Sequence, residues 1–588
     1  MSNILGRFRK RNIQTNFYHF ALVVFVVAIS VCLISGLFIN YFTLKSSVDR
    51  FFTQSKLPNL WIGTNQITKD DEDFFASKFD YGKRYKFETN YNVGSKEFEG
   101  EFFVSDGKIT IPYIMEGERE RGCYVDAKFA ELNNFGLNYS VVSFNYELGG
   151  EKKELEFKVV GFISFAEYLS ADGESMIFID EDVFLDEMKS EFAGIYDADL
   201  SIIDYNEILI SSEVSERDIQ DIQSYYDLSD SKIISVTKRA DIESVIAINN
   251  ELEIAKKMLW IFPIIFVLIS ILVICSAISQ FVLKERYNIG MLKSLGISNN
   301  RILSNYCGYG VVICFIGACF GLMIAPLIIP NMTFAVYDKL YNLPRDLVKL
   351  NCPVWFVVLI ILYAVIVGCF TSLFVTINLV KKTPKECMSR FLKTNLKSRK
   401  KKRKLPVIFG APINNMKINL PRTIMSIVGV AGGSLLILLG FGAEEILKNN
   451  SATKEFLMME IFSRIFKGFS IALVVLTIVI LLVQIFKERH KEMAILRIHG
   501  ERYIKIWLSV LFEMIFIGVI GFAISVLLSG PVMLLNLRIF GISEYFSIEI
   551  LGYLKTFLMI FLTIIFVSGF GLMKIYRLRL DEAIKISE

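Results

Sequence analysis

Eight long apolar runs divide this sequence, each near or above the roughly 20 residues that an α-helix needs to cross the hydrocarbon core of a membrane. Hydrophobic residues make up 53 % of the 588 residues, and the mean hydropathy is +0.47. Because backbone polar groups must be satisfied inside lipid, runs of this kind fold as membrane-spanning helices. The predicted spans lie at about 17–44, 258–283, 305–329, 353–380, 424–442, 461–486, 504–529 and 550–575.

The charges between the spans predict which side of the membrane each connection occupies. Lys and Arg dominate the charges of residues 1–16 and of the linker 381–404, whereas 46–255 is rich in Asp and Glu. Cytoplasmic loops carry the excess of Lys and Arg, and eight spans return the chain to its starting side, so we expect both termini in the cytoplasm and 46–255 outside the membrane. A Lys/Ile/Asn/Phe-rich composition and an external domain without disulfides suit a bacterial plasma membrane. A basic run between two spans has its explanation in topology, and we expect no nucleic-acid partner.

The first apolar run is longer than the core of a signal peptide, and no small-residue cleavage pattern follows Gly36, so we interpret it as a retained span. The predicted organisation has five parts. These are a cytoplasmic N-terminus and first span (1–45), an extracytoplasmic domain (46–255), three spans (256–380), a basic cytoplasmic linker (381–423) and four spans with a short cytoplasmic C-terminus (424–588).

The polar region 46–255 predicts an α+β domain. Strand-like apolar runs occur at 102–104, 141–144, 155–162, 208–210 and 232–237. Helices are predicted at 126–134 and at 215–226, where Ser215 and Asp218 have the spacing of a capping box. Apolar residues at helical spacing over 241–259 predict a helix that continues from the domain into the second span.

Cysteines give this domain no disulfide framework, because only Cys123 of the nine lies inside it. Cys352 lies at a membrane edge, and a link between Cys123 and Cys352 stays open at this stage.

Two similar charged stretches lie between spans. The first surface segment (284–300) opens with Lys284, Glu285 and Arg286, and the second surface segment (487–503) opens with Lys487, Glu488 and Arg489. A charged amphipathic stretch between spans must lie at the membrane surface, where it can meet a partner. Together with the glycines of the following spans, these stretches predict an internal repeat, with eight helices in two groups of four.

Glu513 falls inside the seventh predicted span, where an ionised carboxylate costs roughly 2–4 kcal/mol. It faces either a protein interior or water, so a structural and a functional role both stay open. Gly317 and Gly321 in the third span permit a close approach of two helices.

Enzyme motifs are missing from the sequence. It contains no Gly-x-x-x-x-Gly-Lys-Ser/Thr phosphate loop, no His-Glu-x-x-His, no Cys-x-x-Cys and only three histidines. We therefore predict a non-enzymatic protein without catalytic, metal or cofactor site of its own.

The chain resembles the FtsX-like, or MacB-type, permeases of bacterial ABC transporters. Residues 284–296 and 489–497 are similar to the family's Arg-x-x-Glu-Ile-(small)-x-Leu-Arg stretch, with Asn288 at the place of the family acid in the first copy. Residues 384–388, 414–423, 57–61 and 157–169 resemble further family segments, so the resemblance covers the chain as two fused units.

The resemblance implies that a separate ATPase dimer, which binds the ATP, docks on the two surface segments as coupling helices. One fused chain would seat two ATPase copies. Charged residues would then pair with the ATPase, and Leu292 and Leu496 would enter an apolar groove. The residues predicted for this coupling are Lys284, Glu285, Arg286, Leu292, Gly296, Lys487, Glu488, Arg489, Glu492, Leu496 and Gly500.

The family implies two functions that the sequence does not separate. In the first, the protein exports or extracts an amphipathic substrate, such as an antimicrobial or signalling peptide or a lipid, with membrane lipids around it. In the second, ATP-driven motion of the external domain controls an envelope hydrolase or a sensor kinase by mechanotransmission, without substrate flux. A stand-alone receptor without an ATPase is the third possibility.

Overall fold

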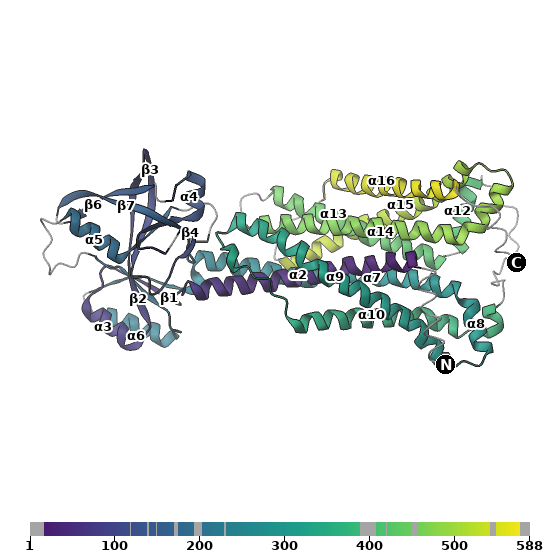
Figure 1. The fold of residues 1–588 in the computed structure, drawn as a ribbon, viewed down its shortest axis with the longest axis horizontal. Helices are drawn as coiled ribbons and strands as arrows, with labels where there is room; N and C mark the ends of the chain where they lie inside the picture. Colours follow the sequence, from purple (N-terminus) through teal and green to yellow (C-terminus); the bar gives the residue numbers. More distant parts are fainter. Residues whose placement is uncertain are drawn as a thin grey trace. The chain divides into compact units, whose positions relative to one another are not determined.

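The computed structural model describes residues 17–117, 119–137, 140–148, 150–169, 175–192, 203–228, 231–388, 407–418, 420–449, 455–540 and 548–576 (Figure 1). The chain divides into two compact units. The membrane unit comprises the described residues up to Asn40, Ile254–Asn331 and those from Cys352 onward. The external unit comprises Tyr41–Glu253 and Met332–Asn351.

Helices cover all eight predicted spans. Among the described residues, six of these helices are long and apolar enough to cross a membrane, and α13 holds a shorter apolar stretch, Ser426–Gly442. The chain is therefore a helical membrane protein with an α+β domain. The helices are α2 (Phe17–Gln54), α7 (Glu243–Lys284), α8 (Arg286–Ser294), α9 (Asn299–Leu340), α10 (Val354–Val380), α11 (Pro384–Met388), α12 (Val407–Ile418), α13 (Leu420–Asn449), α14 (Glu455–Ile498), α15 (Tyr503–Phe540) and α16 (Ile550–Tyr576).

Each half of the membrane unit has its own apolar core. Side chains from α2, α7, α8, α9 and α10 form the first core, and side chains from α13, α14, α15 and α16 form the second. These four helices of the second half run side by side in Figure 1. Large apolar side chains such as Met323, Phe370, Leu527 and Phe566 remain exposed on the outer faces, as lipid-facing side chains do.

Glycines bring α2 and α9 into close contact, as the sequence predicts. A Cβ atom on Gly317 would lie 2.7 Å from Val27, and one on Gly321 would lie 2.7 Å from the carbonyl oxygen of Ala28. Gly521 repeats this arrangement in the second half, where a Cβ atom would lie 3.1 Å from Val430. The small residues thus allow backbone-to-side-chain packing between helices.

We expect Gly321→Ala to destabilise the membrane unit by about 1–3 kcal/mol, because the added methyl group overpacks against the α2 backbone. The thermal midpoint of the purified protein in detergent measures this effect. Gly468→Ala is the matched control, since a Cβ atom at Gly468 meets nothing within 4 Å. Because alanine has a higher helix propensity than glycine, Gly468→Ala should leave the thermal midpoint unchanged or raise it. Equal shifts in both variants would contradict the close contact.

The described residues of the external unit form one mixed sheet of ten strands, in the order β10-β1-β9-β2-β3-β8-β5-β7-β4, with β6 paired to β2 and β7. The pairs β3–β8 and β5–β7 are parallel and the others antiparallel. The strands are β1 (Leu60–Thr64), β2 (Tyr81–Val93), β3 (Lys96–Ser105), β4 (Tyr113–Gly117), β5 (Cys123–Asp126), β6 (Val141–Leu148), β7 (Glu151–Ser164), β8 (Met176–Asp180), β9 (Glu207–Ile210) and β10 (Ile233–Lys238).

Helices cover the sheet in two places. The helices α3 (Lys69–Lys78) and α6 (Glu216–Tyr226) lie together beside β1 and β2 in Figure 1. The rings of Phe74 and Tyr225 stack between them, with their centroids 4.0 Å apart. The helices α4 (Ala127–Asn133) and α5 (Glu181–Glu191) pack on an aromatic core that includes Phe102 and Phe144. The predicted α+β class of this region is therefore correct.

Local signals in the sequence set several element boundaries. Ser215 and Asp218 form the predicted capping box at the start of α6, since each side chain accepts a hydrogen bond from the other residue's backbone N–H. The helix α7 runs unbroken from Glu243 to Lys284 and confirms the predicted continuous helix. Neither Cys123, which is buried, nor Cys352, which is exposed, forms a disulfide.

The external unit also contains Met332–Asn351, which the sequence places among the membrane spans. Asn342 explains the difference. Its side-chain amide donates to Oδ2 of Asp126 at 2.7 Å and to the carbonyl oxygen of Ile163 at 3.3 Å, and its backbone N–H donates to Leu169 O at 3.0 Å. Ser164 donates in turn to the carbonyl oxygen of Asn342. The connection between α9 and α10 is thus bonded into the external unit.

Candidate functional site

The two surface segments differ from the single helices expected over 284–300 and 487–503. In the first, α7 ends at Lys284, Glu285 forms a turn, and α8 covers only Arg286–Ser294. In the second, α14 continues without a break to Ile498. A short turn then leads into α9 or α15, so each surface segment is a helix end followed by a tight turn.

Both helix ends close on a glycine in the left-handed conformation. Gly296 has a φ of 80° and Gly500 a φ of 83°. The N–H of the residue after each glycine donates to the carbonyl oxygen five residues back, from Ile297 to Leu292 and from Glu501 to Leu496, at 3.1 Å in both cases. This is the Schellman pattern, in which glycine adopts the left-handed conformation without steric cost. The two glycines therefore mark equivalent positions of the repeat.

Leu292 and Leu496 pack inward, against the cores of their own halves, and are half-buried. Ile289 and Met493 are fully buried beneath them. This placement differs from the expectation that the two leucines enter a partner's groove.

Other apolar side chains form the outward face. Tyr287, Met291 and Leu295 are 57 %, 40 % and 69 % exposed on the first surface segment. Ile495 and Ile498 are 54 % and 53 % exposed on the second. Met291 and Ile495 each lie five residues before the capping glycine, so the exposed apolar site is repeated. The sequence did not single these residues out, because apolar residues lie on both faces of the helices.

Basic side chains tie each surface segment to the last helix of its half. Lys293 Nζ donates to the carbonyl oxygens of Val380, the last residue of α10, and of Lys382, the latter at 2.6 Å. Arg497 donates at 3.1 Å to Ile575 O, at the end of α16. The final carbonyls of a helix lack intrahelical partners and carry partial negative charge, so cations stabilise them.

The two segments differ most at the position eleven residues before the glycine, which Glu285 and Arg489 occupy. Glu285 is buried and accepts a hydrogen bond of 2.6 Å from Asn288. Arg489 is also buried, and its guanidinium bonds Glu492 in a bidentate manner at 2.9 and 3.1 Å. Arg489 also donates to Glu513 at 3.3 Å. Arg489 and Glu285 thus face the protein interior, whereas we expected contacts with an ATPase.

Glu513 therefore faces a protein interior, which resolves one alternative left by the sequence. Its side chain is 0 % exposed and accepts from Arg489 and, at 2.7 Å, from the Asn415 amide of α12. Of the remaining predicted residues, Glu492 is exposed and Arg286 is half-buried. The side chains of Lys284, Lys487 and Glu488 lie outside what the structure describes.

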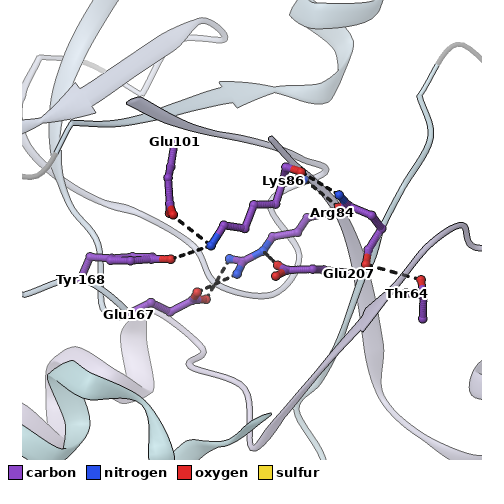
Figure 2. Close-up of polar contacts among 8 residues, drawn as sticks. Thr64, Arg84, Lys86, Glu101, Glu167, Tyr168 and Glu207 are labelled. Carbon is purple, nitrogen blue, oxygen red and sulfur yellow. Dashed lines mark hydrogen bonds and ion pairs between the residues drawn. The ribbon is translucent and has the colours of Figure 1, made fainter. Parts of the chain in front are cut away.

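A second polar cluster lies in the external unit (Figure 2). Arg84 and Lys86 are two residues apart on β2 and so point to the same face of the sheet. Arg84 binds both oxygens of Glu167 at 2.9 and 2.7 Å and reaches Glu207 on β9 at 2.5 Å. The guanidinium also lies 4.8 Å from the centre of the Phe103 ring. We name Arg84, Lys86, Glu101, Glu167, Tyr168 and Glu207 the Arg84 cluster.

Burial and neighbouring charges shift the pKa values of Arg84 and Tyr168 in the Arg84 cluster. Burial lowers the pKa of the Arg84 guanidinium, but the carboxylates of Glu167 and Glu207 outweigh it and hold the pKa above its ordinary value. Burial, together with the carboxylates of Glu101 and Glu167, raises the pKa of the Tyr168 phenol. Tyr168 therefore stays neutral and accepts a hydrogen bond of 3.0 Å from Lys86. The cluster joins β2, β3, β9 and the turn after β7 through ion pairs and hydrogen bonds.

Comparison with known proteins gives one family. Residues 260–384 and 464–580 each match the family described as FtsX-like permease C-terminal. The two matched stretches contain the two surface segments. No curated protein matches the chain.

Proposed function

Because this chain is an FtsX-like permease with two fused units, we propose that it is the permease subunit of an ABC transporter. Members of this family are generally non-enzymatic membrane permeases that work with a separate ABC ATPase. In this proposal α7 and α13 complete eight spans in two four-helix repeats, both termini are cytoplasmic, and the external unit is extracytoplasmic. ATP binds to the partner, and this chain holds no cofactor.

The main support for this proposal is the exposed apolar face of the two surface segments. Met291 and Ile495 occupy equivalent positions on helix ends held by a glycine cap and a basic tie to the last helix. A helix end with exposed apolar residues fits a groove on a partner, and two such ends at equivalent positions of the repeat fit two ATPase copies. Glu492 and Arg286 add charges beside these residues.

The substrate in this proposal is amphipathic, a peptide or a lipid, exported or extracted from the membrane. The alternative is mechanotransmission to an envelope hydrolase or sensor kinase. Here the support is the continuity of α7, which has residues in both units. Loss of peptide resistance or export after deletion of the protein favours the first function. Loss of hydrolase activity or of a sensor response, with no change in flux, favours the second.

Affinity capture of the full-length protein from its native membranes in detergent tests the ATPase partner. We expect an ABC ATPase at two copies per permease chain. Met291→Glu and Ile495→Glu should each weaken binding of one copy by about 30-fold, as expected for a central apolar contact of about 2 kcal/mol. Leu228→Glu, at an exposed apolar position of the external unit, is the matched control and should have no effect.

Two results would contradict the proposal. Capture of no ATPase by the unchanged protein would favour a receptor without an ATPase. Equal loss of ATPase from Leu228→Glu would show that a new surface charge by itself disturbs the complex.

A further inference from the structure

The buried pair Arg489–Glu513 makes the two halves of the permease unequal. Counting from the capping glycines, Arg489, Ser509 and Glu513 of the second half correspond to Glu285, Asn305 and Tyr309 of the first. The second half therefore has an arginine facing an acid on the next helix. The first half has neither an acid nor a base at the two corresponding positions of α9.

The second surface segment is held from three directions. Arg489 Nη1 and Nη2 each donate to Ser509 Oγ at 3.2 Å, and Nη1 reaches Oε2 of Glu513 at 3.3 Å. The other oxygen of Glu513 accepts from Asn415 at 2.7 Å. These contacts join α14, α15 and α12. Both Arg489 and Glu513 are at most 2 % exposed, so water does little to weaken their attraction.

The first surface segment lacks this attachment and contains a break in the helix. The helix α7 ends at Lys284, and Glu285 has a φ of −81° and a ψ of 3°, outside the helical region. Asn305 and Tyr306 are buried on α9, but neither the Asn305 amide group nor the Tyr306 hydroxyl has a hydrogen-bond partner among the described residues. Neither of these two groups therefore bonds α8, which is tied instead to the end of α10 through Lys293.

We propose that Glu513 is a positioning residue that fixes the second surface segment through Arg489, so that this segment moves as one body with α14, α15 and α12. The first surface segment instead turns about Glu285 relative to α7. The inference rests on the proposed function for its consequence, which is that an ATPase seated on the second segment transmits motion directly to α14. When an ATPase on the first segment moves, part of that motion turns α8 about Glu285 and is not transmitted to α7.

Hydrogen exchange of the full-length protein in detergent tests the positioning without any partner. We expect amides of 489–498 to exchange more slowly than those of 286–294 in the unchanged protein. Glu513→Gln should accelerate exchange at 489–498 about tenfold. Tyr309→Phe, the matched change in the first half, should leave 286–294 unchanged because it removes only a hydroxyl group.

A double-variant cycle separates direct pairing from general damage. If Arg489 and Glu513 act as a pair, the double variant Arg489→Gln/Glu513→Gln should exchange about as fast as one single variant. If the double variant exchanges about a hundredfold faster than the unchanged protein, the product of the two single effects, the two residues act independently and the proposal is overturned. If Glu513→Gln does not fold, Ser509→Ala removes one partner of Arg489 and should accelerate the same amides by a smaller factor.

The complex with the ATPase gives the functional readout. Glu513→Gln should keep ATPase co-purification, since Met291 and Ile495 are untouched, and should lower permease-stimulated ATP hydrolysis about tenfold. Unchanged exchange at 489–498 in Glu513→Gln would overturn the positioning role. Failure of the unchanged protein to bind an ATPase would overturn the proposed function, and the exchange experiment would still decide the positioning.

Discussion

Replacing Arg84 by Ala should destabilise the external unit by about 3–5 kcal/mol, because it leaves the buried carboxylate of Glu167 and the partly buried carboxylate of Glu207 without their counter-charge. The Arg84 side chain is 3 % exposed and that of Glu167 4 %. Removing one partner of a buried ion pair is costly because the other charge stays buried alone, even where the intact pair contributes little to the free energy of unfolding.

Hydrogen exchange of β2 and β9 in the full-length protein measures this loss as a lower opening free energy. Lys238→Ala is the control, because Lys238 and its partner Glu216 are 45 % and 83 % exposed and such a pair contributes at most about 1 kcal/mol. Arg84→Lys separates charge from geometry, since an ammonium group cannot bind Glu167 in a bidentate manner. Exchange in Arg84→Ala equal to that in Lys238→Ala would show that the cluster does not hold the sheet.

Asn342→Ala should release the connection between α9 and α10 from the external unit at a cost of about 1.5–3 kcal/mol. The change removes the hydrogen bond to the Asp126 carboxylate, and hydrogen bonds to charged groups fall in this range. Asp126 also caps α4, through bonds of 2.9 and 3.0 Å from the N–H groups of Lys128 and Phe129. We expect the N-terminus of α4 to loosen as well.

Faster exchange of 341–348 and of 127–133 in Asn342→Ala would be the expected result. Asn133→Ala is a suitable control, because among the described residues the Asn133 side chain bonds only the carbonyl oxygen of Phe129, within its own helix. If 341–348 exchanges as slowly in Asn342→Ala as in the unchanged protein, the backbone hydrogen bond to Leu169 is sufficient to hold this connection.

The sequence by itself located the long helices and part of the external sheet. The five strand-like runs fall on β3, β6, β7, β9 and β10, whereas β1, β2, β4, β5 and β8 were not predicted. Hydropathy placed each of the eight predicted spans on a helix of the described structure, since a run of about 20 apolar residues has few alternatives. The capping box at Ser215 and the caps at Gly296 and Gly500 were predictable because they depend on residues only a few positions apart. The repeat was visible for the same reason.

Only the tertiary structure decided which faces are covered. Met291 and Leu292 are neighbours in sequence, yet one is exposed and the other packs on the core, and apolar periodicity does not separate two apolar faces. The shared Lys-Glu-Arg opening aligned Arg286 with Arg489, whereas the glycine caps align Glu285 with Arg489.

The polar clusters likewise required the fold. Arg84 meets Glu167 and Glu207 across more than 80 intervening residues, and Arg489 meets Glu513 on another helix. A charge in the sequence indicates that a partner is needed, because an unpaired buried charge is too costly. Which residue supplies that partner depends on strand order and helix packing, and these are set by contacts between distant parts of the chain.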